Sequence, residues 1–374
     1  MKKKLVAIGV IGLIVLTVVF VLIIRGRQTT ELRIGAILPL TGQSAQYGKW
    51  IRDAIELASE EINQSGGING KKLLIKYKDD QADPMAAAAA MQELASVDKV
   101  PIVFGSWASD SVLAQAPIAE ETHTPIMVEA QSPKISTAGD YVFRIRPDSQ
   151  YYLKLLVPYA YNTLGIRTVS ILYIKNDSGL GQAKVFSDSF QQLGGKVLSS
   201  EGFQQGSVDF RAKLATIKPL KPDAVFIPSY IEAGNILKDA LDMGIKTQFV
   251  ASSTIENPEV LEIAGPGAEG VIYPYHFDAE SDDPKVKEFI QKYSSRFGRQ
   301  PEGFAALAYD GIYAIASVLK DCNEDKECIK TNLYHVNLLG VTGMTRFDDN
   351  GDAIKPLILR MIKNGRFTTI RQKR

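Results

Sequence analysis

The 374-residue sequence has few of the side chains that hold metals or redox groups. It contains 2 cysteines and 3 histidines, and His123, His276 and His335 are widely separated. Two thiols without nearby histidines do not make a zinc site. No metal and no cofactor is therefore expected.

The two cysteines, Cys322 and Cys328, lie close together in the polar stretch CNEDKEC between two helical segments. In an exported protein, such a pair predicts a disulfide that closes a short loop. Two free thiols are the alternative.

The chain also lacks an excess of charge of either sign. It has 43 Lys and Arg against 42 Asp and Glu, and its formal net charge is +1. Nucleic-acid binding normally requires a clear basic surplus. The composition therefore argues against a nucleic-acid partner, and any ligand must be recognised by shape and local contacts.

The first 28 residues differ from the rest of the chain. Lys2, Lys3 and Lys4 precede an uncharged run over residues 5–24, and Arg25 and Arg27 follow it. A run of about 20 apolar residues is long enough to cross a bilayer, whereas a cleaved signal core has about 7 to 15. We predict an uncleaved transmembrane anchor with a cytoplasmic N-terminus, and a removed signal is the alternative. Either way, the remaining chain is exported.

From Leu32 onward, short apolar strands alternate with amphipathic helices. Strands are predicted at residues 33–39, 73–77, 102–104, 125–128, 141–146, 168–174, 196–203, 224–227 and 248–251. Helices are predicted at residues 48–64, 84–96, 109–121, 151–164, 182–193, 210–217, 233–243, 284–297 and 304–320. This alternation indicates an α/β fold with parallel, doubly wound sheets. A chain of this length exceeds one ordinary core, so we expect two lobes joined by a hinge.

The segment GSWASDS, residues 105–111, leaves the apolar strand ending at Phe104 and leads into a helix. A nucleophile turn, a phosphate cradle and a small-ligand pocket are the three possible readings. A hydrolase turn needs glycine on both sides of its serine, and Ser106 has no second glycine after it. In open α/β sheets, ligands bind beyond the carboxyl ends of strands, where helix N-termini present free N–H groups. We therefore predict a ligand cleft and no catalysis.

Three other motifs resemble known sites without meeting their requirements. GPGAEG, residues 265–270, matches a dinucleotide fingerprint in letters, but it follows a helix and precedes a strand. FDDNGD, residues 347–352, lacks the glutamate that completes a calcium loop and is better interpreted as a hairpin turn. Asp79, Asp80 and Asp83 are interpreted as a solvated strand end before a helix.

Several blocks, in order, resemble one known family. They are IGAILPLTGQSAQYGKWIRDAIELASEEINQSGGINGKKL, DDQADP, GSWASDS, NDSGLG, GIKTQF, GVTGMTRFDDNGD and IKNGRF. Together they resemble the type I periplasmic binding proteins of the branched-chain amino acid (Leu/Ile/Val) class of ABC transporters. The likeness extends over nearly everything after Leu32.

The resemblance implies two α/β lobes joined by three crossovers, near Arg146, Tyr275 to Glu280 and Arg346 to Asp349. Lobe 1 would comprise residues 32–146 plus 280–346, and lobe 2 residues 147–279 plus 347–374, after an anchor or signal at 1–28. The lobes would close on one small ligand and deliver it to the permease subunits of an ABC transporter, at the periplasmic or cell surface. A ligand-sensing module that signals through a partner protein is the alternative.

Carried over by resemblance, Ser109 would bind the ligand carboxylate, Tyr47 and Tyr230 would line the ligand, and Trp107 would form an apolar wall. Each of these residues has a purely structural alternative, as a helix cap or as core packing. The full set expected at the ligand is Tyr47, Trp107, Ala108, Ser109, Glu129, Gln131, Ser178, Tyr230, Ser253 and Tyr275.

This sequence also departs from the family pattern at the expected site. Glu129 and Gln131 stand where small residues are typical, and Ser253 and Ser178 replace an acid and an aromatic residue. A buried ammonium without a carboxylate is costly. A leucine-like ligand would therefore need Glu129 to supply the missing acid. The alternatives are an amide, a urea-like compound, an aromatic acid or a polyamine.

Overall fold

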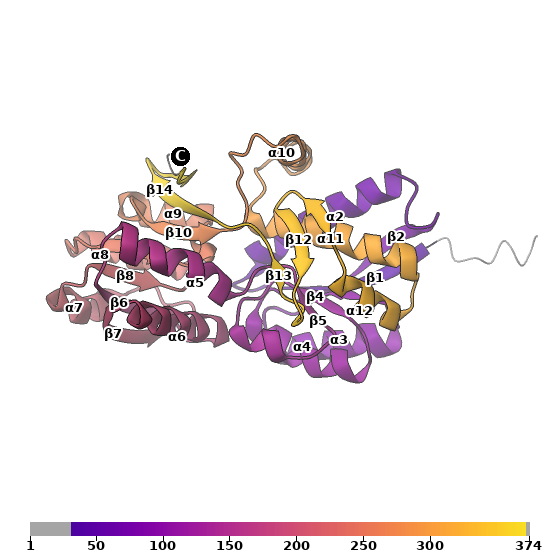
Figure 1. Cartoon of the computed structure of the whole chain (residues 1–374), viewed down its shortest axis with the longest axis horizontal. Coiled ribbons are helices and arrows are strands. Elements are labelled where there is room, and N and C mark those ends of the chain that lie inside the picture. The colour runs from indigo at the N-terminus through magenta and orange to yellow at the C-terminus, as the bar shows by residue number, and fades with distance from the viewer. Residues whose placement is uncertain (1–30, 372–374) are drawn as a thin grey trace, which may run out of the picture.

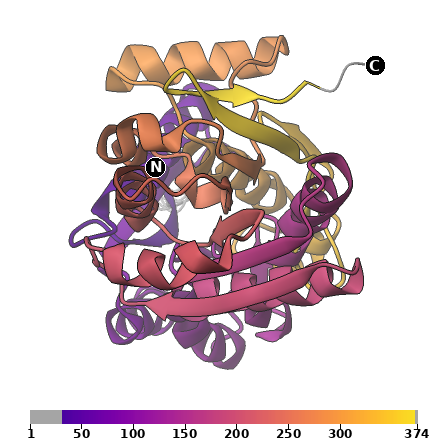
Figure 2. The same ribbon diagram turned by 90° about the vertical axis from the view of Figure 1, so that its left-hand side faces the viewer.

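The computed structural model describes residues 31–371, which form two α/β lobes side by side (Figure 1). Figure 2 views the molecule from one end, with the second lobe in front of the first. The anchor predicted at residues 1–28 lies outside the described residues. Among residues 31–371, none of the helices has the length and apolar character needed to cross a bilayer.

The first lobe is built on a five-stranded parallel sheet in the order β2-β1-β3-β4-β5. Its strands are β1 (Glu31–Leu38), β2 (Lys72–Asp79), β3 (Val103–Phe104), β4 (Ile126–Val128) and β5 (Val142–Arg144). Successive side chains of a strand point to opposite faces. Ile34 therefore packs with the core beneath α2 (Ala45–Gln64), whereas Ile37 packs with α3 (Pro84–Gln92) and α4 (Ser109–Glu121).

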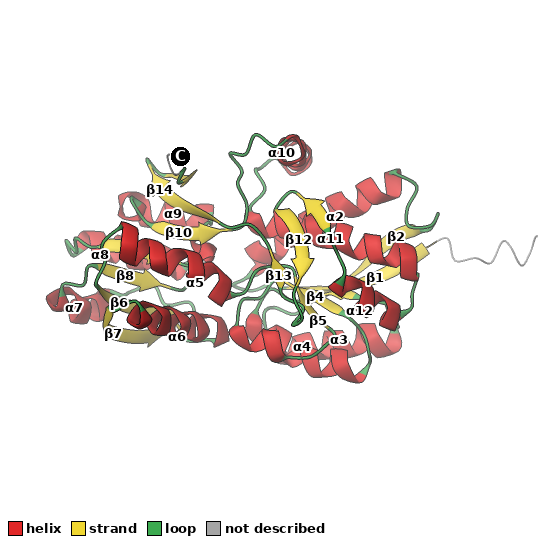
Figure 3. Cartoon of the chain, in the orientation of Figure 1, coloured by secondary structure: helices red, strands yellow, loops and turns green. Residues whose placement is uncertain are grey.

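The second lobe has a seven-stranded sheet in the order β15-β14-β10-β9-β8-β6-β7. Its strands are β6 (Thr168–Ile174), β7 (Lys196–Phe203), β8 (Ala224–Ile227), β9 (Gln248–Ala251), β10 (Ile272–Tyr275), β14 (Ile358–Lys363) and β15 (Arg366–Thr369). The strands β6 to β10 are parallel, and β14 and β15 add an antiparallel edge. Helices flank the strands in both lobes (Figure 3). The helices of the second lobe are α5 (Ser149–Pro158), α6 (Asp177–Gln192), α7 (Arg211–Ile217), α8 (Glu232–Asp242) and α9 (Pro258–Ala264). The predicted α/β class is confirmed.

The chain returns to the first lobe after β10, as the orange helices in Figure 1 show. The returning helices are α10 (Pro284–Phe297), α11 (Gly303–Cys322) and α12 (Lys326–Tyr334), and α11 packs along α2. A disulfide between Cys322 and Cys328 joins the end of α11 to the first turn of α12. This segment covers one face of the first sheet.

The third crossing between the lobes comes later than residues 346–349. The strand β12 (Gly343–Phe347) turns through a hairpin into β13 (Ala353–Ile354), and the two strands pair antiparallel. Gly351 has φ +75°, and its carbonyl accepts the Arg144 N–H at 2.8 Å, so the hairpin stays beside β5. The chain therefore stays beside the first lobe through β13 and crosses to the second lobe only after Ile354. The rest of the lobe division stays a prediction.

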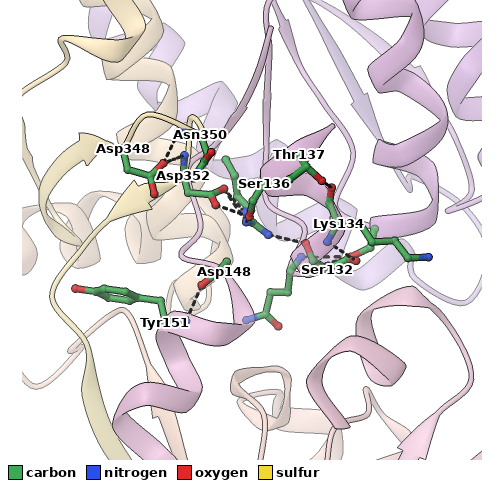
Figure 4. Close-up of polar contacts among 12 residues, drawn as sticks. Ser132, Lys134, Ser136, Thr137, Asp148, Tyr151, Asp348, Asn350 and Asp352 are labelled. Atoms are coloured by element: carbon green, nitrogen blue, oxygen red, sulfur yellow. Dashed lines mark hydrogen bonds and ion pairs between the residues drawn. The ribbon is translucent and has the colours of Figure 1, made fainter. Parts of the chain in front are cut away.

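A polar network fastens this hairpin to the first lobe (Figure 4). The buried Arg144 guanidinium donates to Asp352 Oδ1 at 2.7 Å, to Ser136 Oγ at 2.7 Å and to the Ser132 carbonyl at 2.8 Å. Ser136 Oγ also donates to Asp352 at 2.6 Å. Four groups from three segments thus satisfy one another where the first and third connections lie side by side.

Candidate ligand site

The segment 105–111 follows β3, and its Trp107 ring meets Tyr230 of the second lobe at a centroid distance of 4.9 Å. A Cβ on Gly105 would lie 2.8 Å from Val128 Cγ1, so close packing requires glycine here. Ser106 is fully buried and donates a hydrogen bond to Asp80. Asp80 is therefore a buried support for this turn, and the interpretation of the whole Asp79–Asp83 stretch as solvated was wrong for this residue.

Asp79 and Asp83 have local structural roles. Asp79 accepts from the Leu40 N–H at 2.8 Å, and Asp83 accepts from the Ala86 N–H at 2.8 Å as the cap of α3. No cluster of three or more His, Cys, Asp or Glu side chains suited to a metal ion occurs in residues 31–371.

Four aromatic rings meet where the lobes face each other, and we call them the aromatic cluster: Tyr47, Trp107, Tyr230 and Phe304. Tyr47 and Trp107 stack with ring centroids 4.2 Å apart, and Tyr230 of the second lobe lies 4.9 Å from Trp107. Phe304, from the first turn of α11, meets the Tyr47 ring edge-on at 5.3 Å. All four are buried. Tyr47, Trp107 and Phe304 belong to the first lobe, and Tyr230 belongs to the second. Phe304 is the one member of the cluster that was not predicted at the ligand.

Ser109 begins α4 directly after Ala108, as predicted. Its Oγ accepts the N–H groups of Gln131 and Ser132 at 3.3 and 3.1 Å. Both acceptor directions are thus used by the protein, and the hydroxyl proton remains available to an acceptor. Ser109 also links the turn after β3 to the turn after β4.

The polar residues predicted in the second lobe differ in whether they contact the first lobe near Ser109. Ser253 Oγ accepts from Gln131 Nε2 at 3.3 Å, which is a direct contact between the lobes. Ser178, in the first turn of α6, accepts from Gln182 at 3.1 Å and lies near the Tyr230 hydroxyl. Tyr275 is different, because its hydroxyl accepts the Gly303 N–H at 2.8 Å and thereby supports the start of α11.

Arg146 is a buried cation at this site that the sequence analysis placed only in the first crossover. Its guanidinium donates to Ser253 Oγ at 2.7 Å and to the Glu129 carbonyl at 3.4 Å. Its central carbon lies 4.7 Å from the centre of the Phe304 ring. Arg146 and Phe304 are thus the two functional candidates that sequence reasoning missed. The sequence signal for Arg146 was its place as the second arginine of FRIRP, immediately after a buried strand.

Glu129 lies at the end of β4 with no exposed surface. Neither carboxylate oxygen has a hydrogen-bond partner among the described residues. Burial raises the pKa of Glu129 well above its usual range, and the nearby Arg146 and Lys355 charges oppose this only in part. Burial therefore favours the protonated, neutral form of Glu129, which lies beside the permanent cation Arg146.

This environment makes the stability of the protein depend on pH through Glu129. Because its folded pKa is raised, its stabilising contribution is complete below about pH 4.3 and is lost as pH rises through the folded pKa. Glu129→Gln stays neutral, so we expect the variant to gain on the wild type by about 1.4 kcal/mol per pH unit across that window. Urea denaturation at several pH values between about 4 and 8 measures this. If the free energy of unfolding depended on pH in the same way in both proteins, the raised pKa of Glu129 would be contradicted.

Further buried polar atoms around the lobe contact also have no hydrogen-bond partner among the described residues. They are Trp107 Nε1, Gln131 Oε1, Arg146 Nε, Ser229 Oγ and His276 Nε2. Buried polar groups in proteins are normally satisfied, and an unpaired one costs about 1–3 kcal/mol. Their concentration beside the aromatic cluster is the chemistry expected of a site for a small polar molecule.

Comparisons with known proteins agree with this architecture. A family model described as periplasmic binding protein matches residues 31–366. A Leu/Ile/Val-binding protein homolog of Brucella suis is 27% identical over 336 residues, covering 88% of this chain and 90% of that protein.

Two solved structures are similar over most of their length. The leucine-binding protein LivK of Thermotoga maritima has a TM-score of 0.85 and 28% identity, covering 91% of this chain and 98% of that one. An ABC transporter solute-binding protein of Rhodopseudomonas palustris, in complex with 3,4-dihydroxybenzoic acid, has a TM-score of 0.83 and 26% identity, covering 91% and 96%.

The chain therefore belongs to the periplasmic binding protein family. Within that family it is an extracytoplasmic substrate-binding protein of the ABC-transporter class, as predicted.

Proposed function

We propose that this protein binds one small solute that combines a carboxylate with a compact apolar body, and delivers it unchanged to the permease of an ABC importer. The observation that carries the proposal is the aromatic cluster surrounded by buried polar atoms at the contact between the lobes. The rings suit an apolar body, whereas the Ser109 hydroxyl and the turn after β4 suit an acid group.

The relatives support a carboxylate as the shared feature of the ligand. One is named for leucine and another was solved with 3,4-dihydroxybenzoic acid. These compounds differ in their bodies and in their amine, but each carries one carboxylate. The choice between them depends on residues particular to this chain.

The lobes touch through contacts that a ligand-driven closure would use. Besides the pair of Gln131 with Ser253, Lys134 Nζ contacts Asp177 at 2.8 Å, and Asp110 accepts the Asp177 N–H at 3.3 Å. The two contacts of Asp177 are exposed or half-buried, and polar contacts of this kind are individually weak. They suit an interface that opens and closes.

Removing the largest ring of the cluster tests the proposed site. We expect Trp107→Ala to weaken binding of a stabilising solute by about 30-fold or more, because a buried aromatic anchor is worth about 2 kcal/mol or more. Thermal-shift screening of amino acids, amides, polyamines and aromatic acids identifies the solute, and titration measures the loss. Tyr151→Ala, on the partly exposed side of α5, is the matched control. Equal loss in both variants, or turnover of the solute, would contradict the proposal.

The anchor at residues 1–28 remains part of this proposal. It holds the receptor at the membrane surface, so the full chain for these measurements is extracted from membranes with mild detergent. Recovery of the full-length protein in the soluble fraction without detergent would refute the anchor while leaving the ligand site intact.

A further inference from the structure

We infer that the ligand is a monocarboxylate without an ammonium group, and that Arg146 is the residue that selects it. This inference rests on the proposed function, because it assumes that the solute binds between the lobes at the aromatic cluster. It concerns the choice between an amino acid and a simple acid of similar shape.

The position of Arg146 is the first step. It is 2% exposed, and its guanidinium bridges the lobes by donating to Ser253 Oγ at 2.7 Å. Its Nε–H has no partner among the described residues. The guanidinium lies over the face of Phe304, which also contacts Tyr47 and Trp107. A planar donor group is thus built into the wall of the aromatic cluster.

The charge around Arg146 is the second step. Lys355, the other buried cation near Glu129, is held by Asp310 at 3.5 Å. His276 is neutral, because burial lowers its pKa well below the usual range. Burial raises the pKa of the Glu129 carboxyl, and neither of its carboxyl oxygens accepts a hydrogen bond from the guanidinium. Arg146 is therefore a buried cation with which no carboxylate among residues 31–371 forms a hydrogen bond or an ion pair.

The consequence for the ligand follows from this charge balance. A monoanion would neutralise Arg146, whereas a zwitterionic amino acid would leave the net positive charge and add a second buried cation. Ser253, where the family resemblance expects an acid for the ligand's ammonium, offers a hydroxyl that already accepts from Arg146. Another buried acid on this side, Glu232, has Oε1 held by the Gly206 N–H at 2.8 Å, and its Oε2 has no hydrogen-bond partner among the described residues.

Matched pairs of small molecules separate charge from shape. Isothermal titration of the full chain in mild detergent uses benzoate, 3,4-dihydroxybenzoate and 4-methyl-2-oxopentanoate as acids. Benzamide is the neutral partner of benzoate, and leucine is the amine-bearing partner of 4-methyl-2-oxopentanoate. We expect at least one acid to bind at least about 30-fold more tightly than its partner, the lower limit for a truncated buried charge contact.

Variants of Arg146 test the residue itself. Arg146→Met keeps the length and loses the charge, and we expect it to weaken the binding of the acid by about 30-fold or more, whereas Arg146→Lys retains part of the affinity. Arg211→Met, on an exposed side chain of the second lobe, is the control and is expected to bind like the wild type. If Arg146→Met does not fold, the acid and neutral pairs together with Arg146→Lys carry the test.

The contrary outcomes are distinct. Tighter binding of leucine than of its 2-oxo acid overturns this inference and leaves the solute-binding function standing. Equal binding of benzamide and benzoate, or an unaffected acid affinity in Arg146→Met, also overturns it. If none of these acids binds, the inference falls, and the proposed function falls with it if no amino acid or other carboxylate of the wider panel binds.

Discussion

Lys355→Met is expected to lower the free energy of unfolding by about 3–5 kcal/mol, the usual penalty for removing one member of a buried ion pair. The Lys355 side chain has no exposed surface, and its Nζ donates to Thr342 and Thr345 at 2.6 and 2.5 Å, with Asp310 at 3.5 Å. Without the lysine, the Asp310 carboxylate stays buried without its cation. Urea denaturation of the full chain measures the loss.

The surroundings of Asp310 explain why this loss would be large. Its carboxylate also accepts the N–H groups of Val341 and Thr342 at 2.8 and 2.9 Å, so it cannot turn toward water. Lys184→Met removes a lysine that is 74% exposed and pairs with Asp188 on the surface of α6, and it is the control. A change in the Lys355 variant as small as that of the control would show that the pair contributes no net stability.

The second large effect is expected at Arg144. Arg144→Met leaves Asp352 without its cation and the Ser132 carbonyl without its donor, and we expect a loss of about 3–5 kcal/mol. Asp352 is only slightly exposed, and Ser136 Oγ is its remaining side-chain partner in the network. The hairpin after β12 would then be held to β5 mainly by the Arg144 N–H bond to the Gly351 carbonyl.

Thermal and urea denaturation of Arg144→Met measure this effect, and Arg211→Met is again the control because its ion pair with Asp209 is exposed. A ligand affinity that survives in Arg144→Met would show that this arginine stabilises the junction without taking part in binding. Unchanged stability would show that the network is replaceable by water.

Local patterns predicted the elements that have strong ends. The helix predicted at residues 109–121 coincides with α4, and the helix predicted at 284–297 coincides with α10. Asp283 caps α10 and Gly298 ends it with φ +70°, and both signals lie within a few residues of the helix. The alternation of such elements was enough to predict the fold class.

The family resemblance predicted Tyr47, Tyr230 and Ser253 for the candidate site, and the structure brings all three to the lobe contact. Ser109 and Trp107 belong to a single strand-end segment, and the structure places them at the lobe contact. Arg146 and Ser253 are 107 residues apart and meet only because the crossover brings the lobes together. Asp80 was misjudged for the same reason, since it follows β2 and its partner Ser106 follows β3, which β1 separates from β2. Such pairings depend on tertiary packing, and no spacing in the sequence reveals them.

The sequence contains 2 tryptophans, and they occupy different surroundings. Trp50 is packed inside the first lobe beneath α11, whereas Trp107 stacks on Tyr47 and touches Tyr230 across the divide. A ligand bound at the aromatic cluster would therefore change the environment of the Trp107 indole. We therefore expect the fluorescence of Trp107 to report occupancy directly, whereas Trp50 senses the site only through Tyr47 and Phe304.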